Sequence, residues 1–353
     1  MQQTQKIATI AKSWFNPENP SLRKAIELTI KQGLFSKADI EFQLSVLREN
    51  VANGEIEEWA KRSSVSDQYQ AKEKKVLCLH AGNLPLVGFQ TALGTILSGV
   101  DYYGKLSRKD PWLLASFLDE LKQAGLEHEI QYSTELTDFT NLKAGRIVFA
   151  GSEESVSEVK REILKLNASK KDADYIIRTA KFSIAYLDRW NDQIKDELVQ
   201  SMLRYGGRGC RSVAIVVADF GLDEVKRELK HAVQEFWKEN PQHQNPTPDF
   251  QYQYAYNEAV QRNQLWMENF LIQESEDLPE VDFTVNWVEG GMEKVRELKA
   301  SFGAKVQSVY TVGNEIEGLN IEKLSKAQSP PLFWKPDGVD VLRALYTEQT
   351  GES

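Results

Sequence analysis

The alternation of strands and helices in this chain begins at the stretch Val76-Leu77-Cys78-Leu79-His80-Ala81-Gly82-Asn83-Leu84-Pro85. Its first five residues predict a buried strand, and the residues from Ala81 to Pro85 predict the loop that follows. Residues 86–98 then predict a helix that is apolar over most of its surface. A buried strand that runs through a loop into such a helix is typical of an α/β protein with a parallel sheet.

The same alternation continues along the next part of the chain. Asp110 is expected as the N-cap, and Pro111 as the first residue, of a further helix. Ligands of a parallel sheet lie beyond the carboxyl ends of its strands, and the loops at Asn83, Lys105 and Gly151 fall at that edge. The further strands are expected near 101–106, 129–133 and 146–150, with a helix over 155–166.

The flanking parts of the chain carry weaker patterns. Residues 1–73 are expected to be helical, with Ser36 as an N-cap before a periodic apolar stripe. The second half predicts another α/β domain, and residues 328–338 predict an extended strap before a last helix, because their prolines disfavour a helix. The second-half elements are a strand over 213–217, a helix over 222–237, a polar loop with three prolines over 241–248, a long helix to about 273, a strand over 281–288, a helix over 292–302 and a strand over 306–311.

Composition limits the classes of function. The 353 residues are 41% hydrophobic and 27% charged, which predicts a soluble protein of two or three domains. A net charge of −9 disfavours nucleic acid as a partner. Residues 76–100 lack Asp, Glu, Lys and Arg, but polar residues, a proline and glycines interrupt them, so no membrane span is expected. The two cysteines and four scattered histidines predict neither a disulfide framework nor a metal site, and a reducing cytoplasm fits best.

A second informative stretch is Tyr205-Gly206-Gly207-Arg208-Gly209-Cys210-Arg211-Ser212. Its three glycines let the backbone approach a ligand closely, and arginines beside Cys210 favour the thiolate, which lowers a pKa that starts near ~8.5. Arg204, Arg208 and Arg211 could also contact an anionic substrate. On this stretch by itself two interpretations stay open: Cys210 is a nucleophile, or it packs in a glycine-rich turn that enters a buried strand.

Four motifs follow one another along the chain. They are His80-Ala81-Gly82-Asn83-Leu84-Pro85, Gly104-Lys105-Leu106-Ser107-Arg108-Lys109-Asp110-Pro111, the cysteine turn, and Trp334-Lys335-Pro336-Asp337-Gly338. Together they resemble the LuxC-type acyl-CoA reductases, a branch of the aldehyde dehydrogenase superfamily, and the resemblance spans roughly residues 38–345. It implies an α/β, aldehyde-dehydrogenase-like fold and NADPH-dependent reduction of an acyl-CoA thioester to an aldehyde.

This resemblance also implies a domain organisation. A helical N-terminal segment over residues 1–73 would pack on the body of the protein. A Rossmann-like cofactor-binding domain would follow over 74–180, and a second α/β domain over 181–325 would be catalytic and carry Cys210. Residues 326–353 would form a C-terminal strap and helix.

The catalytic roles that the resemblance implies fall on two residues. Cys210 matches the family nucleophile, whose thiolate attacks the acyl thioester and holds the acyl group for hydride transfer. Asn83 matches the superfamily asparagine whose amide, with the backbone N–H of the nucleophile, forms an oxyanion hole. By contrast Cys78, in the centre of an apolar strand, is expected to be a small buried hydrophobic residue. His80 is expected to be a packing residue and is given no catalytic role.

The cofactor residues that the resemblance implies are Lys105, Ser107, Arg108, Gly151 and Ser152. Lys105 matches the lysine that contacts the adenine ribose, in a loop that also contains Ser107. Arg108 stands where many NAD-using members have an acidic residue, and it would pair with a 2′-phosphate, so NADPH is expected. Gly151-Ser152 resembles the turn beside the cofactor pyrophosphate, although the two glutamates that follow it would repel an anion.

Two departures from the family pattern leave alternatives open. Aldehyde-oxidising members have a glutamate base where this chain has Thr179-Ala180-Lys181-Phe182-Ser183, which disfavours NAD-dependent aldehyde oxidation. Arg208 replaces the more usual glutamine two residues before the cysteine, which keeps a non-catalytic acyl-binding protein as a third hypothesis. The substrate is expected to be an acyl-CoA or an acyl-carrier-protein thioester of fatty acid metabolism. The superfamily also suggests a homo-oligomer.

Overall fold

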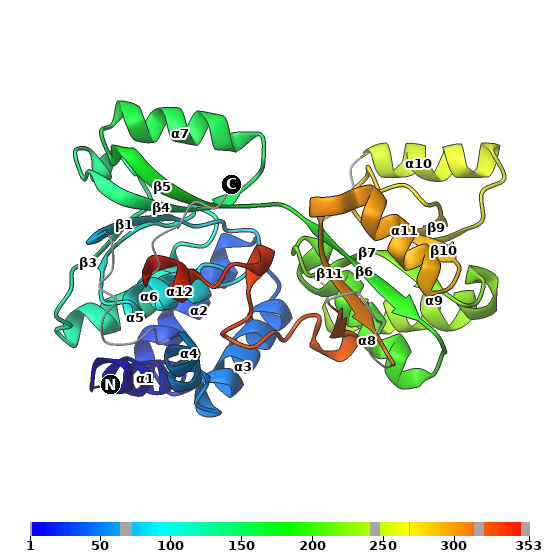
Figure 1. The fold of residues 1–353 in the computed structure, drawn as a ribbon. Coiled ribbons are helices and arrows are strands. Elements are labelled where there is room, and N and C mark those ends of the chain that lie inside the picture. Colours follow the sequence, from blue (N-terminus) through cyan, green and yellow to red (C-terminus); the bar gives the residue numbers. More distant parts are fainter. Residues whose placement is uncertain (1, 64–72, 241–247, 268, 314–320, 347–353) are drawn as a thin grey trace. The chain divides into compact units, whose positions relative to one another are not determined.

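The computed structural model describes residues 2–63, 73–240, 248–267, 269–313 and 321–346. Contacts between Cα atoms divide the chain into two compact units. Figure 1 shows the chain coloured along its sequence. Unit 1 comprises residues 1–35, 40–179 and 331–353, and unit 2 comprises residues 36–39 and 180–330. None of the helices in the described ranges combines the length and the apolar character that crossing a membrane requires.

Unit 1 is built on a five-stranded parallel sheet of order β3-β2-β1-β4-β5. The order reverses between β1 and β4, as in doubly wound nucleotide-binding folds. The strands are β1 (Lys75–Leu79), β2 (Asp101–Lys105), β3 (Ile130–Ser133), β4 (Ala144–Gly151) and β5 (Ser169–Thr179). The helices are α1 (Gln2–Trp14), α2 (Pro20–Gln32), α3 (Lys37–Ala52), α4 (Glu55–Ser63), α5 (Phe89–Leu97), α6 (Trp112–Gln123), α7 (Ser155–Lys165) and α12 (Val341–Tyr346), and the short helix η1 is Leu136–Phe139.

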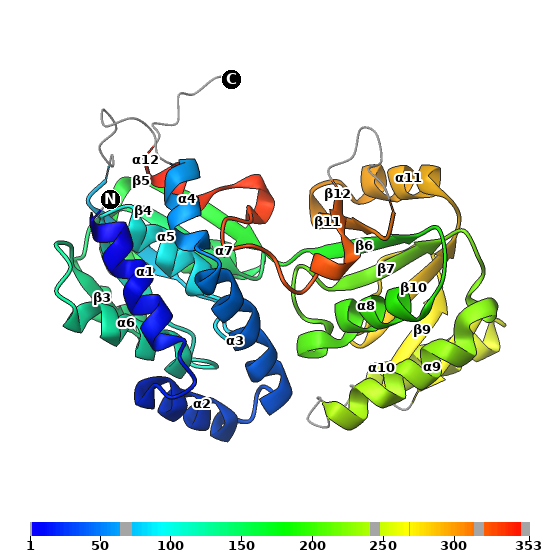
Figure 2. The same ribbon diagram turned by 90° about the horizontal axis from the view of Figure 1, so that it is seen from below.

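Both faces of this sheet are buried, which explains why β1 has an uninterrupted apolar sequence. Val76 and Cys78 of β1 belong to a core that also contains buried residues of α1 to α6 and α12. Leu77 and Leu79 point to the opposite face, where Ile163 of α7 covers them. Figure 1 shows α7 on one side of the sheet, and Figure 2 shows the other helices of unit 1 on its second side. The strand, loop and helix expected over residues 76–98 are confirmed.

Unit 2 is built on a seven-stranded sheet of order β12-β11-β6-β7-β10-β9-β8. Its described neighbours pair in parallel except for β8 and β9, which are antiparallel. Its strands are β6 (Phe182–Leu187), β7 (Val213–Ala218), β8 (Gln264–Met267), β9 (Phe270–Glu274), β10 (Thr284–Glu289), β11 (Val306–Thr311) and β12 (Ile321–Lys323). The helices are α8 (Asp192–Leu203), α9 (Leu222–Glu239), α10 (Pro248–Ala259) and α11 (Met292–Phe302). The short helical turns are η2 (Arg204–Gly207), η3 (Gly303–Lys305), η4 (Leu324–Lys326) and, in unit 1, η5 (Pro336–Gly338).

Several expectations for the positions of helices and strands need correction. The long helix to about residue 273 is wrong: α10 ends at Ala259, and the left-handed Gln261 (φ 55°) precedes the β8–β9 pair. Strands β5, β6, β8, β9 and β12 and helix α8 were not predicted. Most of the three-proline loop lies outside the described residues, although Pro248 opens α10. Helix α6 begins one residue later than expected, with Pro111 at the cap position, but the Asp110 carboxylate still hydrogen-bonds the backbone of Leu113 in its first turn, as a capping residue does.

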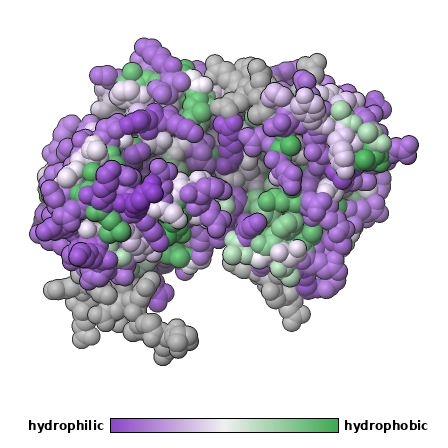
Figure 3. Space-filling view, turned by 90° about the horizontal axis from the view of Figure 1, so that it is seen from above, coloured by the Kyte–Doolittle hydropathy of each residue, from purple (hydrophilic) through white to green (hydrophobic). Residues whose placement is uncertain are grey.

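The surface in Figure 3 is mostly hydrophilic, with apolar residues in small patches.

At the start of α3, Ser36 confirms its predicted capping role, because its hydroxyl accepts a hydrogen bond from the N–H of Asp39 at 2.9 Å. The strap over residues 328–338 contains no α-helix, and α12 follows it as expected.

Candidate active site

The cysteine turn begins with three consecutive residues in the left-handed conformation. Tyr205, Gly206 and Gly207 have φ values of 59°, 68° and 71°. This conformation costs roughly 1–2 kcal/mol for a residue with a Cβ atom, and glycine avoids the cost. At Gly207 a Cβ atom would also lie 2.9 Å from the carbonyl oxygen of Met202. The glycines are therefore required by the backbone path that leads from α8 to Cys210.

The backbone around Cys210 is fixed by hydrogen bonds on both sides. The hydroxyl of Ser183 in β6 donates to the carbonyl oxygen of Cys210 at 3.0 Å. The N–H of Gly209 donates to the hydroxyl of Ser212 at 3.2 Å, and the N–H of Ser212 donates back to the carbonyl oxygen of Gly209 at 2.9 Å. Strand β7 begins at the next residue, so Cys210 lies at the amino end of a strand in the middle of the sheet.

The two cysteines have contrasting environments. Cys210 is partly exposed, whereas Cys78 is fully buried, and neither forms a disulfide. Burial raises the pKa of the Cys78 thiol to about 12, and a hydrogen bond with Thr95 lowers it by a smaller amount. Because a thiolate is the reactive form, Cys78 is unreactive at neutral pH. The expectation that Cys78 is a buried hydrophobic residue is confirmed.

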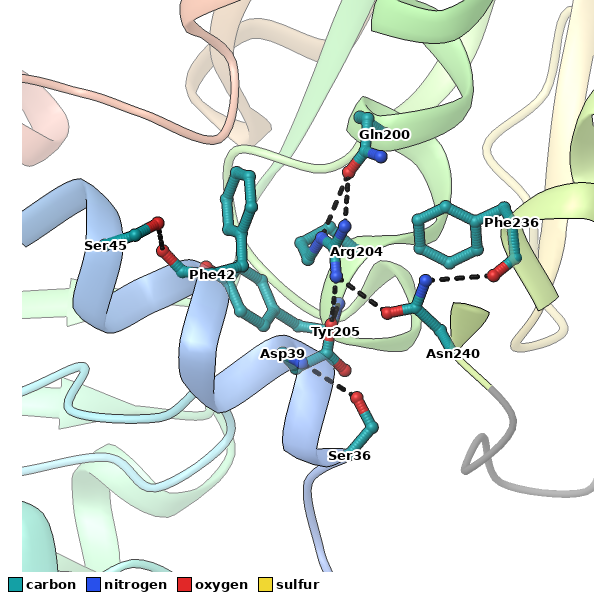
Figure 4. A network of polar contacts seen from close by, with 9 residues as sticks. All are labelled: Ser36, Asp39, Phe42, Ser45, Gln200, Arg204, Tyr205, Phe236 and Asn240. Atoms are coloured by element: carbon teal, nitrogen blue, oxygen red, sulfur yellow. Dashed lines mark hydrogen bonds and ion pairs between the residues drawn. The ribbon is translucent and has the colours of Figure 1, made fainter. Parts of the chain in front are cut away.

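The arginines around the turn do not all face outward. Arg204 is buried, and its guanidinium donates to Asp39 at 3.1 Å and to Asn240 at 2.8 Å (Figure 4). Arg211 is also buried, and it donates to Glu322 and to the carbonyl oxygen of Lys326, both at 2.8 Å. The expectation that these two arginines contact an anionic substrate is therefore wrong, because both are engaged in the interior of unit 2.

Arg208 differs from these two arginines. It is partly exposed and lies 6.0 Å over the ring of Phe283. Among the three it is the side chain whose position leaves it accessible from the solvent.

In unit 1 the loop after β1 carries Asn83 in an exposed position at the carboxyl edge of the sheet. This loop is anchored at Leu86, which has a φ of 55° and donates its N–H to the carboxylate of Asp110 at 2.8 Å. His80 is buried and bonds through Nε2 to the hydroxyl of Tyr102 at 2.7 Å, and burial lowers its pKa to about 3. A neutral, hydrogen-bonded histidine confirms the packing role expected for this residue.

The residues after β2 place two cations at the same edge. Lys105 ends β2 and is half-buried. Burial is the larger cause of its lowered pKa, and the positive charge of the neighbouring Arg108 lowers the pKa further. Arg108 is exposed and forms a two-pronged ion pair with Glu135, in which one N–O distance is 2.9 Å. Ser107 packs against the β1 loop so closely that a Cβ atom on Gly82 would meet its hydroxyl. Glu135, which follows β3, was not identified from the sequence.

The end of β4 provides the last predicted site residues. Gly151 is the final residue of β4, and Ser152 accepts hydrogen bonds through its carbonyl oxygen from the N–H and the hydroxyl of Ser155. Glu154 stands at the cap position of the following helix α7 without a side-chain capping hydrogen bond, and hydrogen bonds from its own backbone N–H and from Ser152 lower its pKa. An ionised carboxylate at this helix terminus competes with any bound phosphate for the same positive end of the helix dipole.

The family of the chain follows from comparison with known proteins. The family model described as acyl-CoA reductase (LuxC) matches residues 22–314. The chain belongs to the LuxC acyl-CoA reductase family. The matched range includes Asn83, Lys105 and Cys210, whereas the strap motif Trp334–Gly338 lies beyond it. A search of curated proteins found no significant match.

Solved structures show that this LuxC-family protein has the aldehyde dehydrogenase fold. A substrate-bound AldH from Staphylococcus aureus is 12% identical, with 100% of this chain and 90% of that chain covered and a TM-score of 0.59. A methylmalonate-semialdehyde dehydrogenase from Sinorhizobium meliloti, described as putative and complexed with NAD, is 12% identical over 89% and 73% of the two chains, with a TM-score of 0.57. An NADP-dependent enzyme from E. coli is 14% identical over 89% and 74%, with a TM-score of 0.55. The α/β, aldehyde-dehydrogenase-like fold expected from the sequence is confirmed.

The family and the fold together identify this LuxC-family protein as an oxidoreductase whose reaction is related to aldehydes. The predicted site residues other than Cys210 belong to unit 1, where Asn83, Lys105, Ser107, Arg108, Gly151 and Ser152 follow the carboxyl ends of β1, β2 and β4. These three strands are neighbours in the sheet, so their loops share one edge. Cys210 is presented by unit 2.

Proposed function

We propose that this LuxC-family protein reduces an acyl-CoA thioester to an aldehyde with NADPH, through an acyl-enzyme on Cys210. The observation that carries the proposal is the contrast between the cysteines inside the family match. Cys210 is partly exposed on a turn whose conformation demands glycines, whereas Cys78 is buried and protonated. A glycine-rich turn that presents a thiol beside a rigid strand suits a nucleophile better than a packing residue.

In the proposed first half-reaction, the Cys210 thiolate attacks the carbonyl carbon of the thioester. A new C–S bond forms, the bond to the coenzyme A sulfur breaks, and the leaving thiolate takes up a proton from solvent. The negative charge that develops on the carbonyl oxygen is assigned to two donors, the amide of Asn83 and the backbone N–H of Cys210. Family resemblance supports this assignment, and such a donor contributes ~3–4 kcal/mol of transition-state stabilisation.

The residues at the carboxyl edge of the unit 1 sheet fit a nicotinamide dinucleotide. The sheet order reverses at this edge, and Lys105 and Arg108 place two positive charges beside the end of β2. Lys105 and Ser107 are assigned to the adenosine ribose, with Gly151 and Ser152 nearer the pyrophosphate. The bound cofactor would supply the hydride for the second half-reaction. As a whole, acyl-CoA, NADPH and a proton give an aldehyde, coenzyme A and NADP⁺.

The preference for NADPH over NADH is assigned to Arg108. Its guanidinium already binds a carboxylate, that of Glu135, in the two-pronged geometry that also suits a phosphate. Because the pair is exposed, it contributes little stability, and Arg108 can exchange Glu135 for a 2′-phosphate. Solved relatives of this fold are described with either form, one complexed with NAD and another as NADP-dependent.

Reductive rather than hydrolytic release is supported by the stretch Thr179-Ala180-Lys181-Phe182-Ser183. It runs from the end of β5 to the start of β6 and contains no carboxylate that could activate water. Without a base at this place, the acyl-enzyme lacks the means of hydrolysis that aldehyde-oxidising members use. A carrier protein in place of coenzyme A, a homo-oligomer and a cytoplasmic location stay predictions.

The test replaces sulfur by oxygen at each cysteine in turn. Aldehyde formation from a panel of acyl-CoA thioesters with NADPH is measured for Cys210→Ser and for the matched control Cys78→Ser. We expect Cys210→Ser to lose activity to background and Cys78→Ser to keep it, since Cys78 lies in the buried core of unit 1. Undiminished aldehyde formation by Cys210→Ser would refute the assignment of the nucleophile.

A further inference from the structure

A short piece of the N-terminal segment belongs with unit 2. Residues 36–39 group with unit 2 although the residues on both sides of them belong to unit 1. Ser36 caps α3, and Asp39 lies in the first turn of that helix, where a carboxylate is favourable. The side chain of Asp39 is nevertheless not directed to solvent, since the residue is 8% exposed.

The carboxylate of Asp39 contacts the start of the cysteine turn at two adjacent residues. Its Oδ1 atom accepts a hydrogen bond from the guanidinium of Arg204 at 3.1 Å and one from the backbone N–H of Tyr205 at 3.3 Å. Figure 4 shows this carboxylate beneath the guanidinium, with Gln200 and Asn240 on the other sides of Arg204. Gln200 accepts from Arg204 at 2.6 Å, and Asn240 accepts at 2.8 Å.

Tyr205 is the first residue of the left-handed turn and directly follows Arg204, the C-cap of α8. It is the one residue of the three-residue left-handed run with a Cβ atom, and it is buried. A strained residue persists only where its surroundings hold it, and here the hydrogen bond from its N–H to Asp39 supplies part of that constraint. Five residues later the same backbone presents Cys210.

We propose that Asp39 is a positioning residue for the nucleophile: by pairing with Arg204 and holding the N–H of Tyr205, it fixes the turn that places Cys210. The inference rests on the proposed role of Cys210. The carboxylate acts through Arg204 and Tyr205 and not on the reacting atoms. A buried, hydrogen-bonded ion pair is a costly way to gain stability, but it is well suited to specify one conformation of a turn.

Graded substitutions separate the two contacts of Asp39. Asp39→Asn removes the charge that pairs with Arg204 but keeps an oxygen for the N–H of Tyr205, and Asp39→Ala removes both contacts. The double variant Asp39→Asn/Arg204→Gln removes both buried charges, so it should recover much of the stability that the single Asn variant loses. Glu49→Gln is the matched control, because Glu49 is exposed on the same helix α3 and undergoes the same chemical change.

Two readouts do not require aldehyde formation: the rate at which iodoacetamide alkylates Cys210, and hydrogen exchange of the peptide that contains residues 204–212. We expect Asp39→Asn to speed exchange in this peptide and to change the alkylation rate severalfold, while Glu49→Gln leaves both unchanged. With acyl-CoA and NADPH, kcat should fall by as much as about 100-fold with KM changed less than about twofold, because displacing a nucleophile by about 1 Å lowers the rate rather than the binding.

The double variant decides between positioning and stability. If the double variant regains the stability of the parent protein but not its exchange protection or kcat, the positioning role is supported. If it regains all three, or if Asp39→Asn leaves exchange and alkylation at the parent values, the role is overturned. Should Cys210→Ser prove active, the proposed function fails, but exchange and alkylation still report whether Asp39 holds the turn.

Discussion

Asp110 gives a quantitative prediction about how unit 1 responds to pH. Its carboxylate accepts the N–H of Leu86 and so anchors the loop that carries Asn83. Burial is the largest cause of its pKa rising from 3.8 to about 6. Because the folded-state pKa lies above the unfolded value, the folded protein holds an unfavourable buried charge above pH 6. Stability is therefore gained as the pH falls through 6 toward 3.8.

The perturbation is Asp110→Asn, which keeps an oxygen acceptor for Leu86 but cannot titrate. Relative to this variant, the parent protein should gain about 2 kcal/mol of unfolding free energy between about pH 7.5 and about pH 4.5. The unfolding free energy of unit 1 is measured by hydrogen exchange of β1 and β2 peptides in increasing urea, corrected for intrinsic exchange at each pH. Glu127→Gln, which alters an exposed carboxylate in the same unit, serves as the control. If the unfolding free energy of the parent minus that of the variant stays constant with pH, or increases as the pH rises, this prediction is wrong.

Three further predictions concern the turn, the cofactor and the core. Both Gly206 and Gly207 have a left-handed φ, but an added Cβ atom would lie 2.9 Å from the nearest atom at Gly207 and 3.8 Å away at Gly206. Gly207→Ala should therefore destabilise unit 2 by about 1 kcal/mol more than Gly206→Ala. Urea midpoints of the two variants measure this difference, and equal midpoints would contradict it. Arg108→Glu should weaken NADPH binding about tenfold more than NADH binding, whereas Lys109→Glu should affect the binding of the two cofactors alike. Fluorescence titration measures the two affinities. Equal losses of NADPH and NADH affinity in Arg108→Glu would contradict the assignment of the 2′-phosphate to Arg108. Leu198→Ala, in the buried face of α8, should lower the free energy of unfolding by about 2–5 kcal/mol, whereas Leu164→Ala, at an exposed position, should lower it by less than about 0.5 kcal/mol. Similar urea midpoints for the two variants would mean that α8 is not packed as described.

The parts of the fold that the sequence predicted are those whose residues carry their own signal. Strands β1 and β7 are continuous apolar runs buried on both faces, and the glycines before Cys210 mark a turn by themselves. Strand β5 was not recognised because it lies at the edge of its sheet and carries Lys170, Lys171 and Asp172 in its exposed half. Strands β8 and β9 are too short for their apolar pattern to be distinguished from a helix.

The contacts that hold the site could not be predicted, because they join residues far apart in the chain. Asp39 and Arg204 are separated by 165 positions, and Arg108 and Glu135 by 27. Each of these residues looks like an ordinary surface charge in the sequence. Burial and pairing, which decide their roles, are properties of the folded chain.

Intact-protein mass spectrometry can detect the proposed acyl-enzyme on Cys210 and its release by reduction. The purified protein is mixed with acyl-CoA thioesters, with and without NADPH, and any adduct is located by peptide mapping. We expect an acyl mass on Cys210 that disappears when NADPH is added, with aldehyde released. Aldehyde formation without any adduct on Cys210, or an adduct on another residue that NADPH discharges, would contradict it.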